Sequence, residues 1–164
     1  QEICKGTQLY GQAIPSQGGD TLFVSMYNAW DQLPKRLQQR LEGVNAEFNY
    51  GGRKSISAQL LNEEDRALPP AVHPAIRRHE ESGRTSLYIN PVHITRLQNM
   101  DEGESDALLA EVLPYLVPEA AQPYRHQWQA GDIVIWDNRC TMHSATGDYP
   151  IEEDRIHWRV TIMQ

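Results

Sequence analysis

The C-terminal segment Arg155–Ile162, with the sequence RIHWRVTI, alternates strictly between polar and apolar residues. Successive side chains of a β-strand point to opposite faces, so this period of two predicts a strand with one polar and one apolar face. The polar face carries Arg155, His157, Arg159 and Thr161. Because a strand needs partner strands for its backbone hydrogen bonds, the chain must contain a sheet.

Two interpretations of this polar face stay open. In the first, the apolar face lies on the core and the polar face is solvated, as in many antiparallel sheets. In the second, the polar face lines the inside of a small barrel and the apolar face packs against covering helices. Arg155 and Arg159 would then point into one concave space and form a receptor for carboxylates, because guanidinium groups stay charged and bind carboxylates in a fork geometry.

The rest of the chain favours several short strands over helices. Apolar residues recur at helical spacing in residues 27–41, where Pro34 must break the helix or open a second one, and in residues 104–117, where Ser105 and acidic residues suit the N-terminal end. A polar excursion over residues 51–70 has room for a short helix near 62–68. Further strands are expected over residues 8–14, 21–26, 86–90, 124–128 and 133–136. This order favours a mainly β fold with helical insertions, either a β-sandwich or a jelly roll.

Composition narrows the class of protein. The chain has 164 residues, 40% of them hydrophobic, so we expect a single domain over 1–164. A formal net charge of -7 gives no electrostatic support for binding nucleic acid or an anionic membrane, although a few arginines that converge in a dry pocket can still bind a small anion. Two cysteines without a CxxC pair, and no apolar run near the roughly 20 residues that span a bilayer, predict a cytoplasmic protein.

Two motifs stand in an order that one known family shows. The first is GGDT at residues 18–21, and the second is WDNR at residues 136–139, followed by a histidine at 143 and an arginine at 155. Together with the central stretch HPAIRRHEESGRTSLYINPVHITRL, these residues resemble the taurine dioxygenase family of Fe(II)/2-oxoglutarate-dependent dioxygenases, whose members act on taurine, alkyl sulfate esters and aryloxyacetate herbicides. The resemblance covers nearly the whole chain and implies a double-stranded β-helix, or jelly roll.

The resemblance also implies a set of site residues. Iron in such enzymes is held by two histidines and one carboxylate, which leaves open positions for 2-oxoglutarate and O2. His143 matches the second histidine ligand. Thr21 and Arg155 match the pair that binds the distal carboxylate of the co-substrate 2-oxoglutarate, and Arg159 matches a position that binds the sulfonate of taurine.

Thr21 and Arg159 each have an alternative interpretation. Thr21 can simply begin a strand, and Arg159 can pair with a surface acid such as Asp154. Trp136 is expected to pack beside the metal, and His93 is a candidate for the substrate pocket.

One part of the family pattern is missing from the sequence. The first histidine ligand and the carboxylate come from an HxD motif shortly before the GGDT segment, and no residue before Thr21 is a histidine. The HxE triplet at residues 79–81 lies in a segment without a metal role in the family. Because one imidazole cannot hold Fe(II), the sequence is a C-terminal piece whose N-terminal portion with the HxD motif is absent, or the ligand-bearing loop lies outside the residues given, or the domain is metal-free. The retained pair of Thr21 and Arg155 favours the first two explanations.

We therefore predict an Fe(II)/2-oxoglutarate-dependent dioxygenase that hydroxylates a small organic anion, namely a sulfonate, sulfate ester or carboxylate. The reaction would consume O2 and decarboxylate 2-oxoglutarate to succinate. One alternative is an oxygenase for an amino acid or betaine-like substrate, in which Arg159 serves structure. Another is a non-catalytic small-anion-binding or interaction domain on the same fold. A homo-oligomer is compatible with each of these.

Overall fold

The computed structural model describes residues 3–49, 62–116 and 122–163. They form two compact units, which we call the sheet unit, residues 3–25 with 122–163, and the helical unit, residues 26–49 with 62–116. The expectation of a single domain over 1–164 stays a prediction, because two compact units can belong to one domain.

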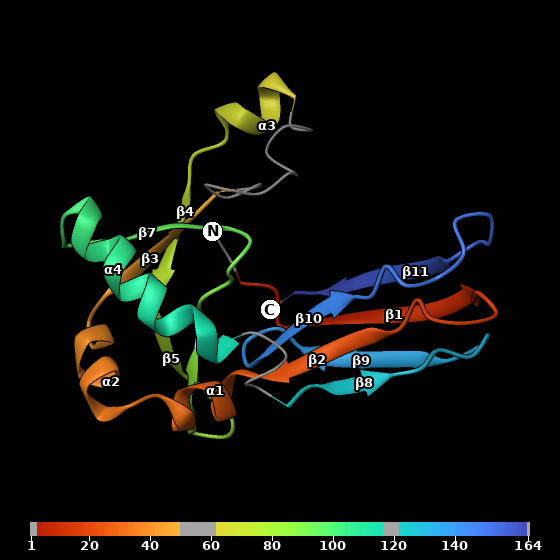
Figure 1. Ribbon diagram of the computed structural model, residues 1–164, viewed down its shortest axis with the longest axis horizontal. Helices are drawn as coiled ribbons and strands as arrows, with labels where there is room; N and C mark the ends of the chain where they lie inside the picture. Colours follow the sequence, from red (N-terminus) through yellow and green to blue (C-terminus); the bar gives the residue numbers. More distant parts are fainter. Residues whose placement is uncertain (1–2, 50–61, 117–121, 164) are drawn as a thin grey trace. The chain divides into compact units, whose positions relative to one another are not determined.

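The sheet unit contains two three-stranded antiparallel sheets (Figure 1). Sheet A has the strand order β11 (Ile156–Ile162), β1 (Gly6–Ala13) and β9 (Ile133–Asp137). Sheet B has the order β10 (Thr141–Ala145), β2 (Thr21–Ser25) and β8 (Tyr124–His126). In both sheets a strand from the start of the chain lies between two strands from its end. The GGDT segment, which leads into β2, and the WDNR motif, which links β9 to β10, therefore belong to the same unit.

Aromatic side chains from the two sheets meet in the core of this unit. The ring of Phe23 on β2 lies 5.2 Å from that of Trp136 on β9. Trp128, which follows β8, has its ring 4.4 Å from that of His157 on β11. Phe23, Trp128 and Trp136 are all buried. The polar face of β11 therefore points toward the interior of the sheet unit.

The alternation of residues 155–162 is confirmed by β11, and its inner face is the polar one. Arg155 and His157 are half-buried, whereas Trp158 is 62% exposed on the opposite face. The interpretation that laid the apolar face on the core is wrong. The expectation that helices cover the apolar face stays a prediction, because the described helices belong to the other unit. The remaining members of this exposed apolar face are Ile133, Ile135, Ile156, Val160 and Ile162.

The helical unit confirms the expected helices with shifted ends. Helices α1 (Met26–Gln32) and α2 (Lys35–Leu41) are separated at Pro34. Helix α4 (Glu102–Val112) continues into the 3-10 helix η2 (Leu113–Leu116), and α3 (Glu63–Ala67) is the expected short helix. Residues 50–61 of the long excursion lie outside the described residues. Among the helices described, none is long and apolar enough to cross a membrane.

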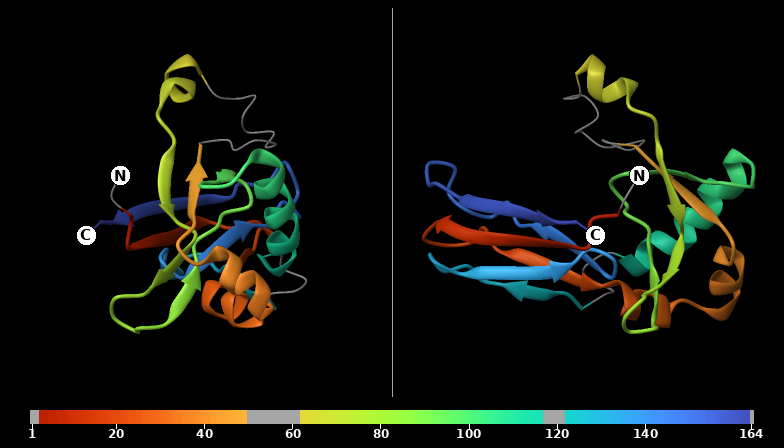
Figure 2. Two further views of the ribbon diagram at one scale, coloured as in Figure 1. Left: turned by 90° about the vertical axis from the view of Figure 1, so that its left-hand side faces the viewer. Right: turned by 180° about the vertical axis from the view of Figure 1, so that it is seen from behind.

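The helical unit also contains short strands (Figure 2). They form a three-stranded sheet of order β4 (Ala71–Pro74), β3 (Asn45–Phe48) and β7 (Ile94–Leu97), and a hairpin of β5 (Ile76–Arg78) and β6 (Thr85–Leu87). Leucines of the helices and of these strands are fully buried, among them Leu37, Leu41, Leu87, Leu97 and Leu108. This unit therefore has an apolar core of its own, unlike the partly polar interior of the sheet unit.

The N-terminal end of α4 carries the expected acidic residues, Glu102 and Glu104, but Ser105 has a different place from the one expected. Asp101, not Ser105, caps the helix, since its carboxylate accepts the N–H of Glu104 at 2.8 Å. Ser105 lies inside the helix, is buried, and accepts the backbone N–H of Leu97 at 2.9 Å. The serine therefore joins α4 to β7.

Candidate active site

The GGDT segment enters β2 through two glycines in the left-handed conformation. The φ angles of Gly18 and Gly19 are +68° and +65°, a region that residues with a Cβ atom rarely occupy. A Cβ atom on Gly18 would lie 2.1 Å from the carbonyl oxygen of Asp148, in the loop between β10 and β11. The paired glycines therefore allow two loops of the sheet unit to approach at backbone distance.

An ion-pair network joins the same two loops. Arg125 on β8 donates from Nε to Asp20 Oδ2 at 2.5 Å and from Nη2 to Asp148 Oδ2 at 2.8 Å. The backbone N–H of Gly19 donates to the other oxygen of Asp148 at 3.1 Å. Asp20 is buried, so its charge needs the partner that Arg125 provides.

The same contacts act on the ionisation of Asp148. Hydrogen bonds from the Thr146 side chain, from Arg125 and from the N–H of Gly19 hold the pKa of the Asp148 carboxyl well below its usual range. Thr146 has a single hydroxyl hydrogen, and the carbonyl oxygen of Asp20 at 3.2 Å competes for it. The bonds from Arg125 and Gly19 are therefore the firmer causes, and Asp148 stays ionised at neutral pH.

Thr21 and Arg155 lie side by side next to this network, as the family resemblance predicts. Arg155 donates from Nε to the carbonyl oxygen of Gly19 at 2.7 Å and reaches Thr21 Oγ1 from Nη2 at 3.4 Å. Trp128 donates from its indole N–H to the same Oγ1 at 3.0 Å. Thr21 is 2% exposed, so its hydroxyl lies in the interior, while Arg155 is half-buried.

The WDNR motif forms the tight turn that carries the chain from sheet A to sheet B. The carboxylate of Asp137 accepts bonds from Nε of Arg139 at 2.9 and 3.1 Å, from its Nη2 at 2.6 Å and from its backbone N–H at 2.8 Å. Asn138 accepts the indole N–H of Trp136 at 2.8 Å and donates to Thr7 on β1 at 2.9 Å. Each polar residue of the motif thus stabilises the turn that places β10 opposite β2.

His143 lies on β10, directly opposite Phe23 of β2. The Trp136 ring packs 4.5 Å from the imidazole, and the Phe23 ring stacks at 6.3 Å. That Trp136 lies beside a metal stays a prediction. Although the residue is exposed to solvent, the protein atoms around its ring lower the pKa of His143, and the positive charge of Arg159 lowers it further. A neutral imidazole with a free lone pair is the form that binds metals.

Three further expectations concern His93, the HxE triplet and Arg159. His93 belongs to the helical unit, so its role in a substrate pocket stays a prediction. His79 of the HxE triplet accepts the backbone N–H groups of Glu81 and Ser82 at 3.2 Å each, which is a structural use of its Nδ1 atom. Within the described residues, Arg159 forms no ion pair with Asp154.

Residues 2–161 match the family described as "Taurine catabolism dioxygenase TauD, TfdA family". The chain belongs to this family. It is 37% identical over 145 residues to the alpha-ketoglutarate-dependent 2,4-dichlorophenoxyacetate dioxygenase of Cupriavidus pinatubonensis, a match that covers 87% of this chain and 50% of the relative. It is 34% identical over 163 residues to an alkylsulfatase of Acinetobacter baylyi, which covers 94% of this chain and 50% of the relative.

A comparison with solved structures leads to the same family. A taurine dioxygenase from Burkholderia xenovorans superimposes with a TM-score of 0.82 at 26% sequence identity, covering 99% of this chain and 54% of that one. This TauD/TfdA family chain spans about half the length of the curated relatives it matches.

Several residues of this TauD/TfdA family chain belong to the site although sequence reasoning assigned them no role. Trp128 contacts Thr21, and Arg125 ties the GGDT segment to the loop that leads to Arg155. His157 lies next to Trp128, and both of its ring nitrogens are buried with no hydrogen-bond partner in the described residues. The only available signal for His157 was its place between Arg155 and Arg159 on the polar face of the strand.

The residues of the sheet unit suit 2-oxoglutarate better than Fe(II), the two ligands that the family resemblance implies. Thr21 and Arg155 offer only donors to a guest, which suits a carboxylate. His143 supplies one imidazole, and the neighbouring carboxylate of Asp137 is already engaged by Arg139. The described sheet unit therefore fits the distal end of 2-oxoglutarate, whereas by itself it does not provide the ligand set that Fe(II) requires.

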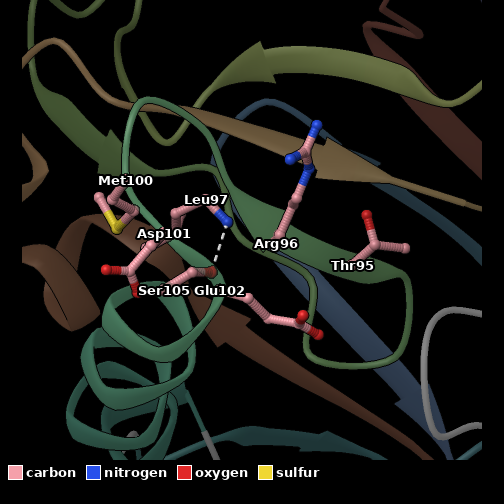
Figure 3. Close-up of a pocket in the computed structure, with 7 residues that line it drawn as sticks. All are labelled: Thr95, Arg96, Leu97, Met100, Asp101, Glu102 and Ser105. Carbon is pink, nitrogen blue, oxygen red and sulfur yellow. Dashed lines mark hydrogen bonds between the residues drawn. The ribbon is translucent and has the colours of Figure 1, made fainter.

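A separate pocket lies in the helical unit. It has a volume of about 250 Å³, and Figure 3 shows its lining residues around the N-terminal end of α4. Arg96 at its rim pairs with Glu47, and Ser105 is engaged by Leu97. The lining residues, none of which was predicted as a site residue, are Thr95, Arg96, Leu97, Met100, Asp101, Glu102 and Ser105.

Proposed function

We propose that this chain is the part of an Fe(II)/2-oxoglutarate-dependent dioxygenase that binds the distal carboxylate of 2-oxoglutarate and supplies one histidine ligand to the iron. The observation that carries the proposal is the buried Thr21 hydroxyl beside the Arg155 guanidinium, in a chain of the TauD/TfdA family. When bound, the iron and 2-oxoglutarate would supply the oxidising chemistry, and the protein binds and orients the reactants.

The two facing sheets of the sheet unit are proposed to be part of a double-stranded β-helix. The support is the turn at residues 137–140, which joins sheet A to sheet B, together with the inward face of β11. In such a fold the space between the sheets holds the site, which agrees with the positions of Thr21 and His143 on the same face of sheet B.

Arg155 and Thr21 would bind the co-substrate by complementary charge and hydrogen bonding. Arg155 is held from Nε by Gly19, and this contact leaves part of its guanidinium fork for a carboxylate. Thr21 adds a hydroxyl donor from a buried position, where a hydrogen bond to a charged group is stronger than in water. Both groups would orient 2-oxoglutarate with its reactive end toward His143.

His143 is proposed as one protein ligand of the iron. Its lowered pKa keeps the imidazole neutral at pH 7, and the packed rings of Trp136 and Phe23 restrict its rotation. The second histidine and the carboxylate would come from an HxD motif outside this sequence.

The substrate is proposed to be a small organic anion that Arg159 holds. Strand geometry puts Arg159 about 13 Å from Arg155 at roughly 3.3 Å per residue, which suits two separate anions better than one. In the described residues Arg159 has no acidic partner. The names of the relatives, a 2,4-dichlorophenoxyacetate dioxygenase, an alkylsulfatase and a taurine dioxygenase, support a carboxylate, sulfate ester or sulfonate.

The proposal is tested on the natural protein that contains this sequence. Anaerobic addition of Fe(II) and 2-oxoglutarate should produce the weak visible charge-transfer band of the iron chelate, and O2 with a substrate anion should then produce succinate. His143→Ala should abolish the band, while Thr21→Val should require more 2-oxoglutarate to reach it. A wild-type protein that gives neither band nor succinate would refute the proposal.

A second candidate function follows from the incomplete metal site. If the natural protein lacks an HxD motif, the same Thr21 and Arg155 pair would make a non-catalytic domain that binds a small dicarboxylate. Calorimetric titration with 2-oxoglutarate in a chelating buffer separates the two functions, because this second candidate needs no metal to bind. The cytoplasmic location and the oligomeric state stay predictions.

A further inference from the structure

The hydroxyl group of Thr21 uses its oxygen, but not its hydrogen, in hydrogen bonds within the described residues. A hydroxyl offers one hydrogen and two lone pairs. Trp128 Nε1 donates to Oγ1 at 3.0 Å, and Arg155 Nη2 approaches it at 3.4 Å, so both lone pairs face N–H donors. Among the described residues no acceptor receives the hydroxyl hydrogen. Because Thr21 is 2% exposed, that hydrogen is a buried donor without a partner inside the protein.

The direction of the bond from Trp128 is unambiguous. An indole N–H can donate and cannot accept, so Thr21 Oγ1 must be the acceptor. A hydroxyl that accepts two bonds has its hydrogen directed away from both donors. The pair of donors therefore orients the hydrogen of Thr21 as well as holding its oxygen.

The Trp128 ring is itself fixed by its neighbours. It is 6% exposed and lies edge-to-face between His126, at 4.6 Å, and His157, at 4.4 Å. A Cβ atom on Gly11 of β1 would lie 3.3 Å from the ring, so the indole also rests closely on that strand. The indole N–H is thus a donor with little freedom to turn elsewhere.

We propose that Trp128 is a positioning residue that commits the Thr21 hydroxyl hydrogen to the distal carboxylate of 2-oxoglutarate. The inference rests on the proposed function and deepens it. Without the indole N–H, one lone pair of Thr21 would be unoccupied, and its hydrogen could rotate away from the co-substrate. With it, Thr21 and Arg155 together present only donors, which favours a carboxylate over a neutral amide at this end of the site.

The test is a double-mutant cycle in the natural protein, read as the KM for 2-oxoglutarate and the kcat for succinate formation. Trp128→Phe keeps an aromatic ring, although a smaller one, and removes the N–H; it should raise the KM about five- to tenfold, the size of one hydrogen bond, with kcat nearly unchanged. In a Thr21→Val background the same change should have no further effect on KM. Trp158→Phe, on the exposed face of β11, is the matched control and should leave KM unchanged.

The outcomes separate this inference from the function it rests on. An equal rise in KM with and without the Thr21 hydroxyl would mean that Trp128 acts through packing alone, and an unchanged KM would likewise overturn the inference. A wild-type protein that does not bind 2-oxoglutarate would refute the proposed function itself.

A second measurement covers the case in which Trp128→Phe does not fold. In the wild-type protein labelled at its indole nitrogens, the Trp128 N–H resonance should be protected from hydrogen exchange. In Thr21→Val it should shift and exchange faster, because its acceptor is gone, whereas Thr21→Ser should restore it. An indole resonance that is the same in all three proteins would contradict the hydrogen bond on which the inference depends.

Discussion

Arg155 and Arg159 belong to the same polar face of one strand segment, yet their surroundings differ. Arg155 is held at Nε by the carbonyl oxygen of Gly19 and touches the buried Thr21. Arg159 is exposed, has no acidic partner in the described residues, and acts on His143 through its charge. The first arginine is built into its site before any ligand arrives, and the second is left available. Pre-organisation at one end would suit the proposed co-substrate 2-oxoglutarate, whereas an open end would suit the proposed substrate anion.

Replacement of Arg155, the arginine already held in its site, should have the largest effect. Arg155→Ala removes the charge that would pair with the distal carboxylate in a half-buried site, so the apparent affinity for 2-oxoglutarate should fall about 100-fold or more. The measurement is succinate formation against 2-oxoglutarate concentration. Arg155→Lys is the matched variant, since it keeps the charge but not the fork, and it should recover only part of the loss. Unchanged affinity in Arg155→Ala would show that Arg155 does not bind the co-substrate.

The close approach of the two loops can be broken at Gly18. Gly18→Ala meets both a φ of +68° and a backbone oxygen at 2.1 Å, so it should destabilise the protein by about 3 kcal/mol. Gly43 is the matched control, because its φ of +71° is similar but a Cβ atom there would meet nothing within 4 Å. Gly43→Ala should cost about 1 kcal/mol. Chemical denaturation of both variants measures the difference, and equal losses would mean that the loops can separate at no cost.

Replacement of Arg159, the arginine left available, should have a smaller effect, and on the substrate anion instead of 2-oxoglutarate. Arg159→Ala should raise the KM for the substrate anion about tenfold, while turnover of 2-oxoglutarate without substrate stays largely intact. A panel of sulfonates, sulfate esters, carboxylates and quaternary amines would show which anion it serves. Activity confined to a cation would contradict the role of Arg159, because like charges repel in a partly dry site.

This contrast marks the limit of what the sequence could predict. The alternation of residues 155–162 predicts a strand and its polar face, and Pro34 predicts the break between two helices, because both patterns are local. Which face of β11 is inside could not be deduced, since it depends on Trp128 and Thr21, which lie far away in the sequence. The motif resemblance predicted that Thr21 and Arg155 meet, but it could not describe the donors that hold them.

Strand β10 shows the same limit in secondary structure. Its sequence TMHSA has no clear alternation of hydrophobicity, so the sequence does not predict a strand there. The turn itself forms because Asp137 and Arg139 bind each other and Asn138 binds Thr7, a contact across more than 100 residues. A strand stabilised in this way by its partners, and by little in its own composition, carries His143.

The smallest expected effect concerns the two histidines beside these arginines. Burial lowers the pKa of His157 from its ordinary value of 6.5, with further contributions from Arg155 and then His126. The protein atoms around its ring also lower the pKa of His143, with the charge of Arg159 as the second cause. Each histidine therefore binds a proton more weakly in the folded state than in the unfolded state. Their contribution to stability is complete above pH 6.5 and is lost as the pH falls through the folded pKa values.

In metal-free protein, the free energy of unfolding should consequently decrease between pH 7 and pH 5, and His157→Leu should flatten part of that slope. Trp158→Phe, next in sequence but on the outer face, should keep the wild-type slope. NMR titration then tests the pairing of each arginine with its own histidine. Arg159→Ala should move the pKa of His143 upward, because a nearby positive charge is removed, and should leave that of His157 where it was. If both histidines moved together, the two ends of the site would be one electrostatic unit, and the contrast between Arg155 and Arg159 would be wrong.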